Sequence, residues 1–415
     1  MKKLLCFVLA TVLMMTSAVA LAETKTLDPQ EKRGITLKSV GLNEVEEGIS
    51  PTTGLTLSSY NVPDGFTGMA KTGRYLPMMA QIGNDDGGVG RRAQWGTAYA
   101  DIIYETLLYR DYGKTRLTAV YNDVIPDSIG FIRSMRMAQV WLREEWGAAF
   151  MFHGQQTYDR ANTVLEAKSL GYRYYDYPYF NGWAGYKDWD DYFTERPNTT
   201  KPFHKNVNAV GVYNLMTKWL ESSAAKEKNY TIPNHAFKFT DEMPEGDTAL
   251  HVRVEWKDLP SGYKDVYVYG SSLIYDVDSG CYLRYMRYGE EDLRPWVDRD
   301  EGSQIAFANV IVQFTKTEFP SSDAPIQYTI GKNHQPAEGN ADFFMAGKHV
   351  SGYWRHESVT GRTVYYGPDG EEISLQRGKT LIILYPDDNV MDCTAIEGFG
   401  AGKVTYSDEL PNFAY

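Results

Sequence analysis

The stretch Asp127-Ser-Ile-Gly-Phe-Ile-Arg-Ser-Met-Arg136 lies between a run of predicted strands and a predicted helix, and it carries two arginines. Upstream of it, residues 102–109 and 117–121 are rich in apolar and β-branched side chains, which is typical of strands. Downstream, the spacing of apolar residues predicts a helix over residues 135–146, with Ser134 as its N-cap. A buried strand is predicted at residues 148–152. The pattern around this stretch therefore alternates between strand and helix.

Two further helices are predicted at residues 157–170 and 206–226, and the second has Asn206 or Asn208 as its N-cap. Beyond Tyr230 the character of the chain changes to short β-rich runs separated by turn signals. The polar segment 222–234 is the predicted boundary between the two parts. We therefore expect an N-terminal α/β domain at residues 51–230 and a C-terminal β-rich domain at residues 231–415.

The first 22 residues have the features of an export signal. Lys2 and Lys3 precede an apolar run, and Ala20-Leu-Ala22 provides small residues at a cleavage site after Ala22. The site has no cysteine of the kind that is lipidated in bacterial lipoproteins, so a secreted chain is expected. The polar residues 23–50 are predicted to be a flexible tail.

The net charge of the chain and its lack of common motifs limit the classes of partner and cofactor that it could bind. Without Lys2 and Lys3 the chain has 40 basic and 54 acidic residues, a net charge of −14, which disfavours binding to nucleic acid or to anionic lipid surfaces. No later stretch is long and apolar enough to predict a membrane span. The sequence contains none of the common metal, phosphate-loop or nucleophile motifs, so we predict no metal and no cofactor.

Two cysteines, Cys281 and Cys393, remain after the predicted cleavage. Outside the cell they could pair as a disulfide, which would stabilise the fold by about 4–5 kcal/mol because it closes a long loop. Two buried free thiols are the alternative, and the spacing of the two residues does not decide between them.

Three segments of the N-terminal half resemble the YerB-like family of bacterial lipoproteins, whose N- and C-terminal domains have no assigned function. These segments are Ala100-Asp-Ile-Ile-Tyr-Glu105, Thr115-Arg-Leu-Thr-Ala-Val-Tyr121 and Ser128-Ile-Gly-Phe-Ile-Arg-Ser-Met-Arg136. In the C-terminal half, Asn309-Val-Ile-Val-Gln313, Gly352-Tyr-Trp354 and the segment 369–380 resemble it too. The resemblance implies an α+β fold, with mixed β-sheets and a helical layer in the N-terminal half and mostly antiparallel β-structure in the C-terminal half. Members are typically lipid-anchored, and this chain departs from them in lacking the lipidated cysteine.

Arg133 and Arg136 are the main candidates for a ligand site. If the helix starts after Ser134, free N–H groups and the positive end of the helix dipole lie beside both arginines, a setting that suits an anion. The alternative is that the arginines pair inside the protein with Asp101, Glu105 or Asp127.

Asp101 and Glu105 share one face of the chain whether the segment is helix or strand. Two such carboxylates near arginines could act as acid and base in hydrolysis of a glycan, or they could form a structural ion-pair network, which we favour. His153 and His204 are candidate bases or hydrogen-bonded core residues. Arg116 is a further candidate for the lining of the same site.

The segment 172–193 is dense in tyrosine and tryptophan. Its rings either stack on sugar rings at a cell-wall surface or tuck a long loop over the sheet, and we favour the second slightly. The sequence therefore predicts a secreted, envelope-associated protein that binds an anionic or glycan ligand near Arg133 and Arg136 and has no recognised catalytic motif. The alternatives are a hydrolase of an envelope polymer that uses Asp101 and Glu105, and a protein–protein interaction module.

Overall fold

The computed structural model of the chain describes residues 23–84, 93–109, 114–158, 160–183, 185, 187–199, 201–258, 270–287, 293–321, 324–387 and 400–411. The predicted export signal at residues 1–22 lies outside these ranges. Among the described residues, no helix combines the length and the apolar composition needed to cross a membrane.

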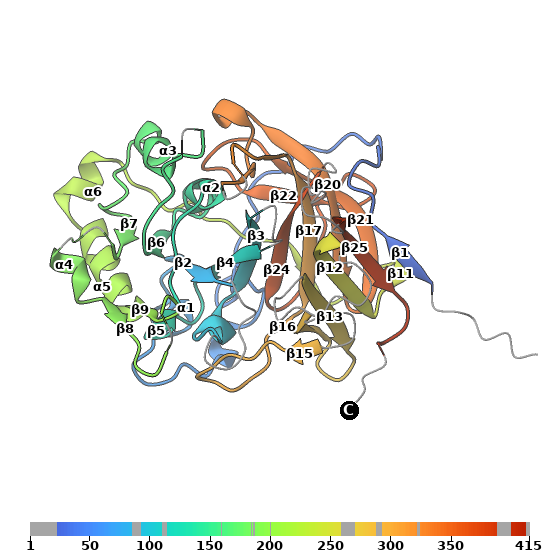
Figure 1. The fold of residues 1–415 in the computed structure, drawn as a ribbon, viewed down its shortest axis with the longest axis horizontal. Helices are drawn as coiled ribbons and strands as arrows, with labels where there is room; N and C mark the ends of the chain where they lie inside the picture. Colours follow the sequence, from blue (N-terminus) through green and yellow to red (C-terminus); the bar gives the residue numbers. More distant parts are fainter. Residues whose placement is uncertain are drawn as a thin grey trace, which may run out of the picture.

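One 11-stranded sheet takes strands from both halves of the sequence (Figure 1). In spatial order its strands are β11 (Asp247–Thr248), β21 (Lys348–His356), β20 (Ala337–Met345), β17 (Asn309–Thr315), β24 (Thr380–Pro386), β3 (Ile102–Tyr109), β4 (Lys114–Tyr121), β2 (Met78–Gly83), β6 (Ala149–Phe152) and β7 (Tyr179–Asn181), and β22 (Thr363–Tyr366) pairs with β21. The pairs formed by β24 with β17 and β3, by β2 with β6, and by β6 with β7 are parallel.

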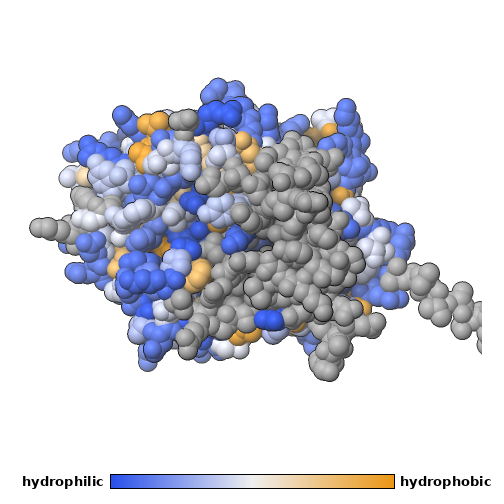
Figure 2. All heavy atoms as spheres, in the orientation of Figure 1, coloured by the Kyte–Doolittle hydropathy of each residue, from blue (hydrophilic) through white to orange (hydrophobic). Residues whose placement is uncertain are grey.

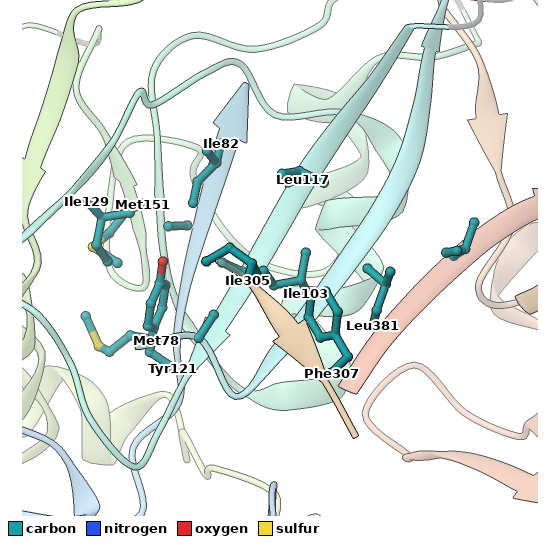
Figure 3. Packing of buried hydrophobic residues seen from close by; sticks show 14 of the residues in the cluster. Met78, Ile82, Ile103, Leu117, Tyr121, Ile129, Met151, Ile305, Phe307 and Leu381 are labelled. Atoms are coloured by element: carbon teal, nitrogen blue, oxygen red, sulfur yellow. The ribbon is translucent and has the colours of Figure 1, made fainter. Parts of the chain in front are cut away.

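Both faces of the central strands are buried, which explains their continuous apolar sequences. Every residue of β24 and of β17 is buried. One face packs against α2 (Met137–Trp146), through residues such as Trp146. The other face packs against a second sheet and against α5 (Ala209–Leu220). Figure 3 shows this second core, where Met78, Ile103 and Leu381 of the large sheet face Ile305 and Phe307.

The second sheet has seven strands and belongs mostly to the C-terminal half. It contains β1 (Thr24–Thr26), β25 (Gly400–Ser407), β12 (His251–Asp258), β13 (Gly270–Asp276), β14 (Cys281–Arg287), β15 (Leu293–Pro295) and β16 (Ala306–Phe307). Its pairs are antiparallel. Smaller sheets join β5 (Ser128–Gly130), β9 (Lys205–Asn208) and β8 (Phe193–Glu195), then β10 (Phe239–Thr240) and β23 (Leu375–Gln376), then β18 (Thr317–Glu318) and β19 (Ile326–Gln327).

The remaining helices are short and lie mostly at the end of the molecule away from the second sheet (Figure 1). They are α1 (Met69–Thr72), α3 (Thr163–Ser169), α4 (Lys187–Asp190) and α6 (Ser223–Glu227), with 3-10 turns η1 (Leu57–Ser59), η3 (Thr97–Tyr99) and η4 (Lys332–His334). Where described, the surface at this end is largely hydrophilic with scattered apolar patches (Figure 2). The predicted α+β class, with its helices in the N-terminal half, is confirmed.

Several predicted helix bounds were wrong. The predicted helix at 157–170 is only α3, because Asn162 caps it by accepting hydrogen bonds from Val164 N and Leu165 N. The predicted helix at 206–226 is the strand β9 followed by α5 and α6. Of its two predicted caps, Asn208 is the one used, since its side chain accepts from Gly211 N.

Residues 23–50, for which we predicted a flexible tail, lie against the folded body. β1 pairs with β25, and the side chain of Leu37 is buried. Arg33 donates to both carboxylate oxygens of Asp342, at 3.2 and 3.0 Å, and Asp342 is fully buried. A buried carboxylate needs such a partner, and this requirement is invisible in the polar composition of the segment.

Candidate functional site

Three candidate residues meet where parallel strands of the large sheet end. β2, β6 and β7 run parallel, and their last residues are Gly83, Phe152 and Asn181. His153 directly follows β6, and Trp183 lies just beyond β7. The Arg133 backbone joins the same edge, because its N–H donates to Gln81 O of β2 at 2.8 Å. The carboxyl ends of parallel strands are the usual place for ligand sites in such sheets.

Hydrogen bonds fix these three segments to one another. His153 N donates to Arg133 O at 2.9 Å, and Met135 N donates to Gly154 O at 3.0 Å. The buried Asn181 accepts through Oδ1 from both Gly154 N and Trp183 N, each at 3.0 Å. Asn181 therefore ties the turn after β6 to the turn after β7.

The turn after β6 requires a glycine. Gly154 has φ +87°, a conformation that residues with a side chain rarely adopt. A Cβ at this position would also lie 2.5 Å from the indole ring of Trp183. The absence of a side chain lets the Trp183 ring lie close over this turn.

Trp183 is an exposed ring with a defined orientation. Its side chain stacks on His153, with ring centroids 6.0 Å apart and planes 6° apart, while the residue remains 67% exposed. The Arg133 guanidinium lies over Phe131 and Phe203, at 5.7 and 5.4 Å from the ring centroids. His153 therefore stacks on an exposed indole; desolvation lowers the pKa of His153, and the Arg133 guanidinium is close enough to lower it further.

Basic side chains complete this surface. The backbone joins them to Arg133, because Ile132 N donates to Lys205 O at 2.8 Å. His204 Nε2 and Lys205 Nζ each lie 3.2 Å from Glu195 Oε1, and the hydrogen bond from Lys205 lowers the pKa of Glu195. We call the group formed by Arg133, His153, Trp183, Phe203, His204 and Lys205 the Arg133 surface.

His153 is the titratable group at the centre of the Arg133 surface. Desolvation, followed by the nearby charge of Lys205, lowers its pKa from 6.5 to about 4, with smaller effects of His204 and Arg133. The imidazole is therefore neutral at pH 7 and stacks on Trp183 as a neutral ring.

We expect the His153 Cε1–H resonance to titrate near pH 4 in an NMR experiment, with His153→Gln used for its assignment. The unfolded chain binds a proton at His153 more readily than the folded chain does. The neutral form of His153 therefore supports folding above about pH 6.5, and the free energy of unfolding falls as the pH drops toward 4. The glutamine variant should lose less stability over that range. A midpoint near pH 6.5 would contradict this assignment.

Ser134 and Arg136 do not have the roles predicted for them at the helix start. α2 begins at Met137 rather than after Ser134, and Arg136 is the N-cap residue. Ser134 Oγ donates to His153 O at 3.1 Å, so the prediction that Ser134 caps the helix was wrong. Arg136 N donates to Gln139 Oε1, and its Nη1 donates to Ser134 O and Met135 O. The first residues of α2 are buried, which removes the expected solvent-facing helix start.

Asp101 lies in a separate, buried network. Its Oδ2 accepts from Thr52 Oγ1 at 2.9 Å, and from Asn122 N and Asp123 N at 2.8 and 3.1 Å. Desolvation, followed by the charge of Asp123, raises the pKa of Asp101 well above its usual value. Asp123 itself accepts from Ser50 and from Thr53, so the two carboxylates hold the turn at residues 50–53.

Glu105 forms a buried ion pair with Arg284 of the C-terminal half. Glu105 Oε2 lies 2.8 Å from Arg284 Nη2, and their side chains are 2% and 0% exposed. Glu105 Oε1 accepts from Thr115 Oγ1 at 2.8 Å, and the Arg284 guanidinium lies 4.2 Å from the Trp296 ring centroid. Glu105 therefore lies in a closed core.

The sheet register separates Glu105 from the Arg133 surface. Glu105 pairs with Leu117, Leu117 with Ile82, and Ile82 with Ile132. Three strand spacings of roughly 4.8 Å separate the backbone of Glu105 from that of Ile132. Arg116 is also buried, on β4 between β3 and β2. The structure therefore brings together Arg133, Ser134, His153 and His204, and it places Asp101, Glu105 and Arg116 elsewhere.

Comparisons with known proteins give the family. The description "Protein of unknown function (DUF3048) N-terminal domain" matches residues 66–209, and the corresponding C-terminal domain matches residues 263–382. The chain belongs to the DUF3048 family. It is 26% identical over 310 residues to the Bacillus subtilis (strain 168) protein named "Putative lipoprotein YerB", a match covering 74% of this chain and 81% of the relative. The predicted YerB-like resemblance is thereby confirmed.

A solved structure shares the fold. The crystal structure of YerB protein from Bacillus subtilis matches with a TM-score of 0.58 and 20% identity, over 86% of this chain and 99% of that chain. The N-terminal DUF3048 match contains β2 to β7, and the C-terminal match contains β17, β20 and β21. The two DUF3048 domains thus share one sheet. The Arg133 surface lies entirely within the N-terminal match.

The aromatic segment 172–193 of this DUF3048 protein divides between core and surface. Tyr179, Phe180 and Trp189 are buried, and Tyr177 stacks on Trp219 with ring planes 2° apart. Trp183 is the exposed exception among the described rings of the segment. A disulfide and two free thiols both stay predictions, because Cys281 begins β14 whereas Cys393 lies outside the described residues.

Proposed function

We propose that this DUF3048 protein is exported to the cell envelope, where the Arg133 surface binds an anionic or glycan ligand without chemical turnover. The observation that carries the proposal is the exposed, oriented indole of Trp183, stacked on His153 within a group of basic side chains. Trp183 is 67% exposed, and its stacking on His153 holds the indole in an orientation in which its polar and apolar atoms can contact a partner molecule.

The envelope location draws on two supports. The N-terminal 22 residues have the pattern of an export signal. The relative from Bacillus subtilis carries the name "Putative lipoprotein YerB". Members of one family commonly work in one compartment, which favours the same location for this chain.

The ligand class follows from the side chains of the surface. The free face of an indole suits the flat, weakly polar face of a sugar ring. The guanidinium of Arg133 and the ammonium of Lys205 suit a carboxylate or phosphate group. The neutral imidazole of His153 adds a hydrogen-bonding group without adding charge at pH 7. An acidic glycan of the cell wall would use all three features.

We expect Trp183→Ala and Arg133→Glu each to weaken binding of soluble peptidoglycan fragments by about tenfold or more, the equivalent of about 1.4 kcal/mol. Neutral chitooligosaccharides should respond to Trp183→Ala and much less to Arg133→Glu, because they lack carboxylates. Isothermal titration calorimetry of the full mature chain measures both effects.

Matched control variants distinguish a loss of binding at the Arg133 surface from the effect of changing any exposed residue. Met243 is 66% exposed and Arg74 is exposed, and neither belongs to the Arg133 surface. Met243→Ala and Arg74→Glu should leave binding unchanged. The proposal fails if the Arg133 and Trp183 variants bind the fragments as tightly as these controls do, or if the wild-type protein binds neither class of probe.

A further inference from the structure

A second concave region lies where the two DUF3048 domains meet, and none of its lining residues belongs to the Arg133 surface. It has a volume of about 590 Å³, which is within the range of small-molecule sites. One side is formed by residues of α2 and α3, and the other by residues of the β18–β19 hairpin and the η4 turn. We call it the Trp141 groove, and the residues used below are Trp141, Arg160, Glu166, Glu318, Tyr328, Lys332 and His334.

The floor of the Trp141 groove is a pair of stacked rings. Trp141 and Tyr328 lie with centroids 5.5 Å apart and planes 18° apart. They are 4% and 9% exposed and rest on a small apolar cluster that includes Ala161 and Ile330. The two rings thus form an almost fully buried floor of the groove.

Each ring of the floor donates to a carboxylate, and each carboxylate holds a basic side chain at the rim. Trp141 Nε1 donates to Glu166 Oε1 at 2.6 Å, and His334 Nε2 lies 2.7 Å from the same oxygen. Tyr328 OH donates to Glu318 Oε2 at 3.2 Å, and Lys332 Nζ lies 2.5 Å from Glu318 Oε1. The carboxylates of Glu166 and Glu318, each fixed by a ring of the floor, therefore orient His334 and Lys332.

The backbone of the η4 turn supports this arrangement. Asn333 and His334 both have positive φ, 55° and 61°, although neither is a glycine. Such a conformation costs free energy in most residues and recurs at ligand sites. Gly331 N donates to Gln335 O at 2.8 Å and closes the turn, so Lys332, Asn333 and His334 all line the groove.

We propose that the Trp141 groove binds a small organic anion whose apolar or planar body lies against the edges of Trp141 and Tyr328. Its acidic group would lie among Arg160, Lys332 and His334. Glu166 and Glu318 are already engaged by their own donors, whereas Arg160 and Lys332 retain N–H groups that a carboxylate or phosphate can use. The site is independent of the Arg133 surface.

The probes for this proposal are phenylacetate, octanoate and the neutral phenylacetamide, titrated into the ¹⁵N-labelled full chain. We expect phenylacetate to shift the Trp141 indole N–H resonance with saturation in the millimolar range, and phenylacetamide to bind at least about fivefold more weakly. Octanoate tests which kind of ligand body the groove accepts. Octanoate binding as tight as that of phenylacetate indicates a site that tolerates aliphatic chains, and weaker octanoate binding indicates a site for planar acids. An absence of saturable shifts at Trp141 for both anions overturns the proposal.

Variants of the basic residues test which of them contact the acidic group of the ligand. Lys332→Gln and Arg160→Gln should each weaken phenylacetate binding about fivefold, and Lys332→Arg should restore it because the charge is kept. Lys316→Gln is the matched control, since Lys316 is 61% exposed, lies 3.9 Å from the same Glu318 and is absent from the groove lining. Equal effects of the Lys316 and Lys332 changes would overturn the proposal. Arg133→Glu should leave phenylacetate binding unchanged, so the two sites can fail separately.

Discussion

Replacing Glu105 with glutamine is expected to lower the free energy of unfolding by about 3 kcal/mol or more. The change leaves the Arg284 guanidinium, which is 0% exposed, without a counter-charge in the core. Breaking a buried ion pair by removing one partner typically costs about 3–5 kcal/mol, because the remaining charge stays desolvated. Glutamine can still accept from Thr115 Oγ1, which places the expected loss near the lower end of that range.

Urea denaturation followed by circular dichroism measures this loss. Glu338→Gln is the matched control, because Glu338 pairs with Arg355 on the surface at 2.7 Å and is 60% exposed. Exposed pairs contribute about 0–1 kcal/mol, so the control should lie close to the wild type. A second variant, Glu105→Leu with Arg284→Met, should recover much of the lost stability, since an apolar pair of similar volume avoids the desolvation cost. A loss below about 1 kcal/mol for Glu105→Gln would show that Arg284 is compensated by other groups.

The Glu105→Gln variant also distinguishes a structural role of Glu105 from a catalytic one. A hydrolase that used Glu105 as its acid or base would lose activity in the glutamine variant while keeping its stability. A core ion pair gives the opposite pattern, a large loss of stability. The position of Glu105 between Thr115 and Arg284 favours the second outcome.

Strand patterns in the sequence predicted several strands of the large sheet well, but not that the two halves of the chain share it. The continuous apolar runs became β3, β17 and β24, because strands buried on both faces need apolar residues at nearly every position. Helix lengths were predicted less well. Asn162 and Asn208 each start a helix later than the apolar pattern suggested, since a capping side chain competes with helical geometry before it.

The candidate site was predictable only in part, because its partners come from distant parts of the chain. A spacing of four predicts that Asp101 and Glu105 share a face, yet it carries no information about Thr52 or Arg284, which separate them into two networks. His153 was identifiable as a polar residue at a strand end. Lys205 was overlooked, although it adjoins His204 in the sequence.

The Trp141 groove had no signal in the sequence at all. Its residues come from segments 137–169 and 318–334, and each segment alone has an ordinary composition. Only the parallel pairing of β3 with β24 brings the two halves into one sheet and so sets α2 beside the β18–β19 hairpin. Pairing between strands so far apart in sequence is beyond local pattern analysis.

Replacing Arg33 with methionine is expected to destabilise the protein by about 3 kcal/mol and to expose residues 23–50 to proteolysis. Arg33 donates to Ala341 O at 3.1 Å, to Gly352 O at 2.9 Å and to both oxygens of the fully buried Asp342. Methionine keeps the apolar stem but leaves Asp342, within the described part of the chain, with His349 and Ser351 as its remaining side-chain partners. The cost is that of an incompletely paired buried charge.

Lys25→Met provides the control within the same segment. Lys25 pairs with Asp247 at 2.8 Å, but the two side chains are 38% and 54% exposed, so their pair should contribute less than about 1 kcal/mol. Limited trypsin digestion should then cleave the Arg33 variant in residues 23–50 well before the Lys25 variant, with thermal denaturation reporting the difference in stability. Equal digestion of the two variants would mean that β1 and Leu37, rather than Arg33, hold the segment in place. Faster digestion of the Arg33 variant would identify one guanidinium as the anchor between residues 23–50 and the β20–β21 hairpin.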